Sequence, residues 1–184
     1  MIDKNFFKTI KILDGGMGQE LLSRGLISKG SLWSASALIE KKYNQLVVNT
    51  HLDFINAGSD VIVTNNFSAR RIRMIENKVN DKFEFANKKA GELALKAREL
   101  SKKKIMIAGS LPSQCDTYIE NKRDSHEIKI DFYDQVQCLK SYVDFFYLDV
   151  ISSSRECEIA LNITSKTKLP TLVGLHLKAN GKLP

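Results

Sequence analysis

The sequence predicts an α/β protein built around a parallel sheet, and three observations support this class. Short runs rich in β-branched and aromatic residues alternate with longer segments of helical periodicity. The runs are almost continuously apolar, as strands are when both faces of a sheet are covered. Glycines or polar residues directly follow several runs, as expected where loops gather at one edge of such a sheet. An open doubly wound sheet and a (β/α)8 barrel both fit this alternation.

The apolar runs give five strand candidates. They are residues 10–13, 60–64, 105–108, 145–148 and 171–175. A complete (β/α)8 barrel usually needs about 250 residues, so five strands complete an open sheet but only part of a barrel. Periodicity alone does not choose between the two.

Amphipathic helices are predicted between these strands, because apolar residues recur there every three or four positions. The helices span residues 17–24, 43–57, 83–100, 131–143 and 154–166. Gly25 and Gly58 stand where the first two helices should end. The polar stretch 117–129 is predicted to be a surface loop.

The composition is that of a single soluble domain covering residues 1–184, with 43% hydrophobic and 27% charged residues. No apolar stretch approaches the roughly 20 residues of a membrane-spanning helix, and the N-terminus lacks a secretory signal pattern. We therefore expect a cytoplasmic protein with no membrane partner. The net charge is +7, but the basic residues are spread out and are not interleaved with aromatics. This pattern favours a solvated surface over a nucleic-acid partner.

Cysteines and histidines give no recognisable metal or disulfide pattern. The three cysteines form no CxxC pair, and an odd number without a signal peptide favours reduced thiols. No histidine has a cysteine or acidic residue at ligand spacing, so surface or packing roles are predicted. The residues concerned are Cys115, Cys138, Cys157, His51, His126 and His176.

The candidate functional residues follow the predicted strands. Asp14 and a run of glycines come after the first strand, Thr64 ends the second, and Ser110 and Asp149 come after the third and fourth. Loops at this edge of a parallel sheet form ligand pockets, and Asp14 could hold an ammonium group. A glycine-rich turn without a ligand explains the first segment equally well, and a dinucleotide site is a weak alternative because the pattern is G-G-x-G. Trp33 either lines such a pocket or fills space beneath a loop.

Four segments of the chain resemble the motifs of the homocysteine S-methyltransferase family in order and spacing. Residues 12–21 read ILDGGMGQEL, and residues 32–35 read LWSA. Residues 57–65 read AGSDVIVTN, and residues 107–110 read IAGS. The resemblance implies the (β/α)8 barrel of that family. It also implies transfer of a methyl group from an unidentified donor to homocysteine sulfur, which yields methionine.

The resemblance further implies which residues bind homocysteine. They are Asp14, Gly15, Gly16, Met17, Thr64, Asn65, Ser110 and Asp149. Asp149 and Val150 stand where the family usually has Glu followed by Thr or Tyr. The carboxylate is therefore one methylene shorter here, and a neighbouring polar group is replaced.

The family implies a zinc ion held by three cysteine thiolates, which favours the reactive thiolate of homocysteine. Those cysteines follow the sixth and eighth strands of the barrel, whereas this sequence reaches Pro184 just beyond the fifth. We therefore expect the N-terminal part of a barrel, truncated after about strand five and lacking the zinc ligands. Such a fragment should be inactive alone and should self-associate through its open edges. A non-catalytic binding or scaffold half-barrel is the alternative.

Overall fold

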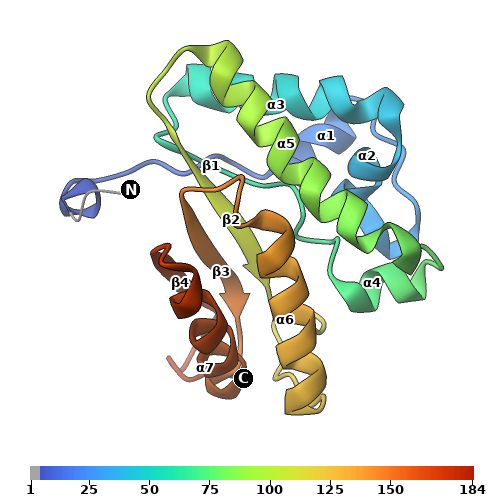
Figure 1. Cartoon of the computed structure of the whole chain (residues 1–184), viewed down its shortest axis with the longest axis vertical. Helices are drawn as coiled ribbons and strands as arrows, with labels where there is room; N and C mark the ends of the chain where they lie inside the picture. Colours follow the sequence, from blue (N-terminus) through green and yellow to red (C-terminus); the bar gives the residue numbers. More distant parts are fainter. Residues whose placement is uncertain (1–4) are drawn as a thin grey trace.

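Four strands form one parallel sheet within residues 5–184, the part of the chain that the computed structural model describes (Figure 1). Each strand pairs with the next along the chain, in the order β1-β2-β3-β4. The strands are β1 (Val61–Val63), β2 (Met106–Pro112), β3 (Phe145–Ile151) and β4 (Thr171–Leu175). The predicted α/β class with a parallel sheet is confirmed.

A helix precedes every strand of the sheet: α3 comes before β1, α5 before β2, α6 before β3 and α7 before β4. The α-helices are α1 (Met17–Ser23), α2 (Ser36–Ile39), α3 (Asn44–Ala57), α4 (Arg71–Glu76), α5 (Phe83–Ser101), α6 (Ser125–Leu139) and α7 (Ser154–Thr164). Short 3-10 segments are η1 (Phe6–Lys8), η2 (Gly30–Ala35), η3 (Lys41–Tyr43), η4 (Asn80–Lys82) and η5 (Ser165–Thr167). Gly58 ends α3 with φ of 113°, as its position predicted. In the described part of the chain, no helix is long and apolar enough to cross a membrane.

The strand predicted at residues 10–13 is wrong for most of its length. Only Leu13 forms a bridge, to Val61, and the N–H of Asp14 donates to the carbonyl of Val61 at 2.9 Å. Ile10 is 92% exposed, so the apolar run there is not covered on both faces. The segment approaches β1 only at its last residues, and a full ladder does not form.

The loop predicted at residues 117–129 is too long, because α6 begins at Ser125. The side chain of Asp124 accepts hydrogen bonds from the N–H groups of His126 at 2.8 Å and Glu127 at 3.4 Å. This is an N-cap, which satisfies donors that the helix itself leaves free. The polar first turn hid the helical periodicity, and His126 lies in that turn instead of a loop. The helix also ends at Leu139, four residues earlier than predicted.

Strands β2 and β3 run further than predicted, and this changes where two candidate residues lie. Ser110 and Asp149 are inside these strands, paired with Tyr147 and Pro112 respectively, and do not follow them. Small residues such as Gly109 interrupt the apolar pattern, so the ladder continues past the point where the sequence stops looking like a strand.

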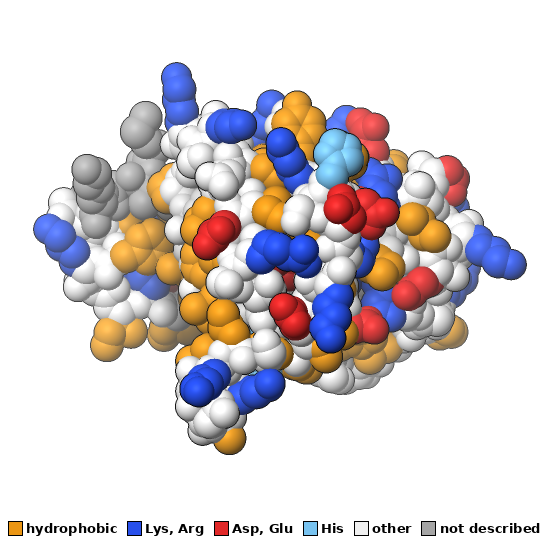
Figure 2. Space-filling view, turned by 90° about the horizontal axis from the view of Figure 1, so that it is seen from below, with side chains coloured by type: hydrophobic (Ala, Val, Ile, Leu, Met, Phe, Trp, Pro, Cys, Tyr) orange, Lys and Arg blue, Asp and Glu red, His pale blue; other side chains and the backbone are white. Residues whose placement is uncertain are grey.

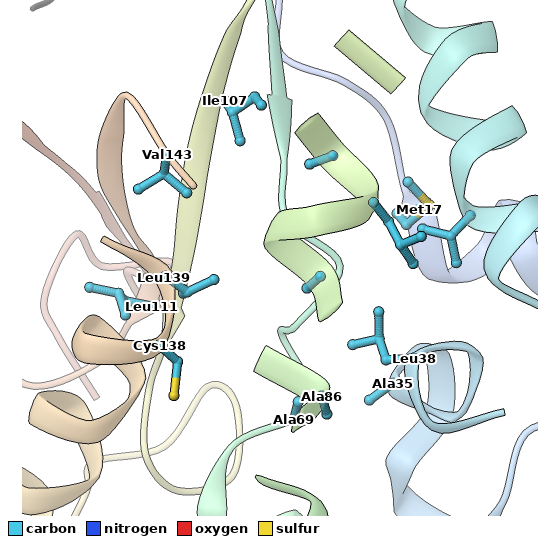
Figure 3. Close-up of a cluster of buried hydrophobic side chains, with 14 of the residues drawn as sticks. Met17, Ala35, Leu38, Ala69, Ala86, Ile107, Leu111, Cys138, Leu139 and Val143 are labelled. Carbon is cyan, nitrogen blue, oxygen red and sulfur yellow. The ribbon is translucent and has the colours of Figure 1, made fainter. Parts of the chain in front are cut away.

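The two faces of the sheet carry different side chains, because alternate residues of a strand point to opposite faces. Ile62, Ile107 and Phe146 belong to the main core, which they share with the helices. Figure 3 shows Ile107 and Leu111 of β2 in this core, with Leu139 of α6 beside Leu111. The opposite face, here called the inner face, carries a separate small cluster of Val61, Ala108 and Phe145 with flanking partly buried residues.

The end of the sheet toward which the β2 and β3 arrows point in Figure 1 is the face seen in Figure 2. Basic and acidic side chains lie among one another there, with apolar side chains between them (Figure 2). The net charge of +7 is therefore not gathered into a uniformly basic patch on this face.

Candidate functional site

A cavity of about 310 Å³ lies at the ends of β1, β2 and β3 and extends over the start of α1. The structure brings together all eight residues that the sequence singled out for substrate binding. The cavity is lined by Leu13, Asp14, Gly15, Gly16, Met17, Gly18, Trp33, Ser34, Val63, Thr64, Asn65, Phe67, Ser110, Tyr147 and Asp149.

The period of the strands explains why Ser110 and Asp149 face this cavity. Each stands an even number of residues from an inner-face residue, Ala108 or Phe145, so it points to the same side of the sheet. Ser110 is 1% exposed, and its Oγ has no hydrogen-bond partner in the described part of the chain. A buried hydroxyl that lines a cavity without a partner is free to bond a ligand there.

Asp14 is held at the floor of the cavity by β1. Its Oδ2 accepts a hydrogen bond from the N–H of Val63 at 3.0 Å, and its side chain is only 4% exposed. The pKa of Asp14 is raised to about 7, chiefly by burial; the charge of Asp149 contributes to this rise, and hydrogen bonds from backbone N–H groups oppose it. Burial also raises the pKa of Asp149 to about 6. Both shifts come first from lost hydration, which an ammonium group of a ligand would replace.

Glycine is required beside Asp14 because an aromatic ring occupies the space that a side chain would need. A Cβ on Gly18 would lie 2.6 Å from Cζ2 of Trp33, and a Cβ on Gly15 would lie 2.8 Å from Cε1 of Phe54. Trp33 therefore does both things that the sequence left open: it lines the cavity, and it packs closely against the chain. Its backbone has φ of 44° and ψ of −123°, a conformation that costs energy in a non-glycine residue.

Thr64 and Asn65 line the cavity, but Oγ1 of Thr64 and the amide nitrogen of Asn65 already have partners within the protein. Thr64 Oγ1 accepts from the N–H of Ser110 at 3.0 Å and donates to Oδ1 of Asn66 at 2.6 Å. The amide nitrogen of Asn65 donates to the carbonyl of Ser34 at 3.2 Å. These bonds tie β1, β2 and η2 together around the cavity, so both residues also fix its shape.

Sequence reasoning missed a chain of buried amides behind the cavity. Asn66 donates to the carbonyl of Ser110 and to Oδ1 of Asn87, both at 3.0 Å. Gln135 donates to the same Oδ1 of Asn87 at 3.2 Å and accepts from Gln114 at 2.9 Å. Asn87 and Gln135 lie on the buried faces of α5 and α6, and a polar residue within an apolar helix face was the available signal.

Glu156 is the acidic end of this network, and it too was missed. It is fully buried, and its carboxylate accepts from Ser113 Oγ at 2.7 Å, the N–H of Gln114 at 2.6 Å and Asn121 Nδ2 at 2.7 Å. Three donors satisfy most of the acceptor capacity of one carboxylate. The loop after β2 is thereby fastened to α7.

His51 also lies next to the candidate site, which the sequence did not predict. Its Nδ1 is 3.9 Å from Oδ2 of Asp14, and neither ring nitrogen has a hydrogen-bond partner in the described part of the chain. The side chain is fully buried, and this burial lowers its pKa to about 3, so the ring is neutral at physiological pH. A packing role was predicted for His51, and its burial agrees with that, but its proximity to Asp14 depends on the tertiary fold.

The cysteines of this chain do not fit a catalytic zinc site. Among residues 5–184, no three His, Cys, Asp or Glu side chains converge so that they could hold a metal ion. Cys115 contacts Ser113 Oγ at 3.3 Å in the loop after β2, whereas Cys138 lies in the helix-side core (Figure 3). Burial raises the pKa of all three thiols, that of Cys138 to about 11. Zinc itself deprotonates a thiol that coordinates it, so it is the separation of the three cysteines that keeps them from forming its donor set.

The fold and the cavity define a parallel α/β protein that gathers its site at the carboxyl ends of its strands. The chain belongs to the homocysteine S-methyltransferase family, whose model matches residues 11–183.

Two curated relatives illustrate this membership. Homocysteine S-methyltransferase 2 of Zea mays is 35% identical over 115 residues, which cover 55% of this chain and 33% of the maize protein. Homocysteine S-methyltransferase of Escherichia coli is 30% identical over 145 residues, which cover 77% of this chain and 45% of the bacterial protein. The chain thus spans between a third and a half of the length of these relatives.

A solved structure shows the same fold. The homocysteine methyltransferase MmuM from Escherichia coli, in its metallated form, superposes with a TM-score of 0.83 at 23% identity. The match covers 98% of this chain and 68% of the bacterial chain.

Proposed function

We propose that this chain binds homocysteine in the cavity between Asp14 and Asp149, as part of a protein that methylates the homocysteine sulfur to give methionine. The observation that carries the proposal is the pair of buried carboxylates that line the same small cavity. They occupy positions that the family motifs assign to amino-acid binding. Two acidic groups of this kind suit the ammonium end of an amino acid.

The roles of the lining residues follow from which of their polar atoms remain available to a ligand. Asp14 keeps one carboxylate oxygen bound to the N–H of Val63, which leaves the other to accept from the ligand's ammonium group. Asp149 supplies a second acceptor, and the free Oγ of Ser110 can bond a polar atom of the ligand. An incoming ammonium group should lower the pKa of both carboxyls, so homocysteine binding is coupled to loss of their protons.

The chemistry at the sulfur needs a set of metal ligands that residues 5–184 do not bring together. We propose that the zinc ligands implied by the family lie outside them, and that this chain forms the amino-acid-binding part of a larger barrel. The described residues should accordingly bind homocysteine without turning it over.

Calorimetry with homocysteine tests the binding role directly. Asp14→Asn should weaken binding by roughly 1.5–3 kcal/mol, the worth of a charge-assisted hydrogen bond. The matched control is Asp53→Asn on the exposed face of α3, where the carboxylate pairs with Arg24 at 2.5 Å and faces solvent. The control should leave the affinity unchanged.

A ligand without the ammonium group separates amino-acid recognition from other causes of binding. We expect 4-mercaptobutyrate, which keeps the thiol and the carboxylate, to bind the wild-type protein far more weakly than homocysteine. Equal affinities for the two ligands, or an unchanged affinity in Asp14→Asn, would contradict the assignment of Asp14 and Asp149.

A further inference from the structure

His51 is a fully buried side chain of α3 whose two ring nitrogens both lack a hydrogen-bond partner among the described residues. Its neighbour Thr50 is equally buried, but the Thr50 hydroxyl donates to the carbonyl of Leu46, one turn earlier, at 2.9 Å. A buried polar group without a partner is costly, and such groups are rare in folded proteins. The position of His51 therefore calls for a partner in some state of the protein.

The group that the ring faces is the carboxylate of Asp14. Nδ1 of His51 lies 3.9 Å from Oδ2 of Asp14, which is too long for a hydrogen bond. Oδ2 already accepts from the N–H of Val63 at 3.0 Å, and a carboxylate oxygen can accept a second bond. Phe54, three residues further along α3, would lie 2.8 Å from a Cβ on Gly15, so this face of the helix lies directly behind the turn that carries Asp14.

Other charged groups on α3 and on the elements packed against it bond elsewhere. Among the described residues, Asp14 is the one carboxylate within ion-pair distance of His51. Burial lowers the pKa of His51 to about 3, so the ring is neutral and offers a single N–H. The bonds of the surrounding charged groups join Arg24 to Glu20 and Asp53, Lys42 to Glu40, Lys96 to Gln45, Lys103 to the carbonyl of Ile55, and Asp60 to the N–H of Ile12.

We infer that His51 is a positioning residue for Asp14: when Asp14 ionises, as a bound ammonium group requires, the Nδ1–H of His51 closes on Oδ2 and holds the carboxylate toward the cavity. The inference rests on the proposed function, because it assumes that Asp14 binds the ligand. Oδ2 then accepts from both Val63 and His51, which leaves Oδ1 for the ammonium group. An N–H donated to a charged carboxylate is stronger than one donated to a neutral group, which favours closing the gap. His51 does not line the cavity, so it acts through Asp14.

This role has a consequence for the pH dependence of binding. A donor to the ionised carboxylate makes Asp14 easier to ionise. Below the pKa of Asp14, which is about 7, binding of an ammonium group must also remove a proton from Asp14. Loss of the His51 donor should therefore weaken binding at low pH and matter little at pH 9, where Asp14 is ionised with or without it. A packing role would weaken binding equally at every pH.

Two substitutions of similar size test this. His51→Leu removes the donor, whereas His51→Asn places an amide N–H near the position of Nδ1. Calorimetry with homocysteine should show that His51→Leu weakens binding about tenfold at pH 6 and less than about twofold at pH 9. His51→Asn should stay within about threefold of wild type at both pH values. An equal loss at the two pH values, or no recovery in His51→Asn at pH 6, would overturn the inference.

Thr50→Val is the matched control within the same helix. It removes a buried hydroxyl that bonds the carbonyl of Leu46 and not Asp14. Any effect of this substitution on homocysteine affinity should be the same at pH 6 and pH 9. If Thr50→Val reproduces the pH dependence of His51→Leu, that dependence reports on the packing of α3 in general, and the role of His51 is refuted.

A measurement without ligand separates failure of this inference from failure of the proposed function. The side-chain carboxyl carbon of Asp14, assigned by its absence in Asp14→Asn, is followed by NMR as the pH is changed. Its titration midpoint should lie about one pH unit higher in His51→Leu than in wild type and should return in His51→Asn. An unmoved midpoint would overturn the inference whether or not homocysteine binds. If the midpoint moves but homocysteine does not bind, the proposed function fails while the contact between His51 and Asp14 stands.

The wild-type protein decides if His51→Leu does not fold. Nitrogen chemical shifts of the His51 ring at pH 9, where Asp14 is ionised, report which nitrogen carries the proton. We expect the proton on Nδ1, facing Asp14. A proton on Nε2 would leave Asp14 without this donor and would overturn the inference.

Discussion

Nδ1 of His51 lies 3.9 Å from Oδ2 of Asp14, and both side chains are almost completely buried. The same burial moves the two pKa values in opposite directions, to about 3 for His51 and to about 7 for Asp14. Near neutral pH the histidine is therefore uncharged, and Asp14 is only partly ionised. An ion pair between them is not the resting state, and Asp14 stays available to a cation from the ligand.

His51→Leu should make the protein less sensitive to acid. The folded-state pKa of His51, about 3, lies below its ordinary value of 6.5, so the unfolded chain binds the proton first. This histidine therefore costs stability as pH falls below about 6.5. The free energy of unfolding of His51→Leu, minus that of wild type, should rise by about 2 kcal/mol between pH 7 and pH 5. Urea denaturation at each pH gives the difference; a constant value would show that His51 is hydrated or protonated in the folded protein.

The stability of Asp14→Asn relative to wild type should change with pH in the opposite direction from that of His51→Leu. The pKa of Asp14 is raised in the folded state, from 3.8 to about 7, so its protonated form is favoured by folding. That contribution is present at low pH and is lost as pH rises toward 7, whereas asparagine stays neutral throughout. The free energy of unfolding of Asp14→Asn, minus that of wild type, should rise by about 3 kcal/mol between pH 5 and pH 8. Urea denaturation at each pH gives this difference. If the variant instead loses stability relative to wild type as the pH rises, Asp14 has a cationic partner in the folded protein.

Much of the fold could be predicted from the sequence because local signals and the tertiary structure agree. The apolar run around Val61 is a buried strand, Gly58 ends the helix before it, and β4 has the predicted bounds. Prediction failed where contacts with residues distant in the sequence determine the local structure. Residues 10–13 read as a strand but find a partner only at Leu13, and Ser110 lies in a strand whose composition does not look like one.

The candidate site shows the same division. Its members could be gathered in advance, because parallel topology brings the ends of successive strands together. The amide chain through Asn87 and the position of His51 depend on contacts between helices and loops distant in sequence. No spacing within the chain encodes those contacts.

Glu156→Ala should destabilise the protein strongly, although Glu156 does not line the candidate cavity. The substitution leaves the donors of Ser113, Gln114 and Asn121 buried without an acceptor, which should cost roughly 3 kcal/mol or more in the free energy of unfolding. Glu158→Ala, on the exposed side of the same helix, is the matched control and should stay within about 0.5 kcal/mol. Similar values for the two variants in urea denaturation would show that the loop after β2 does not depend on Glu156.

The free edge of β4 should make this 184-residue chain self-associate. In the described residues, β4 pairs only with β3, and its Val173 and Leu175 are 36% and 51% exposed on one side of the strand. An unpaired edge that presents apolar side chains is a template for pairing with a second chain. Placing lysines at Val173 and Leu175 should shift sedimentation toward the monomer, because like charges would meet at the edge. Leu161→Lys, at an exposed position of α7, adds a charge away from the edge and should leave the association unchanged. If the edge variant associates as wild type does, the contact lies on another surface.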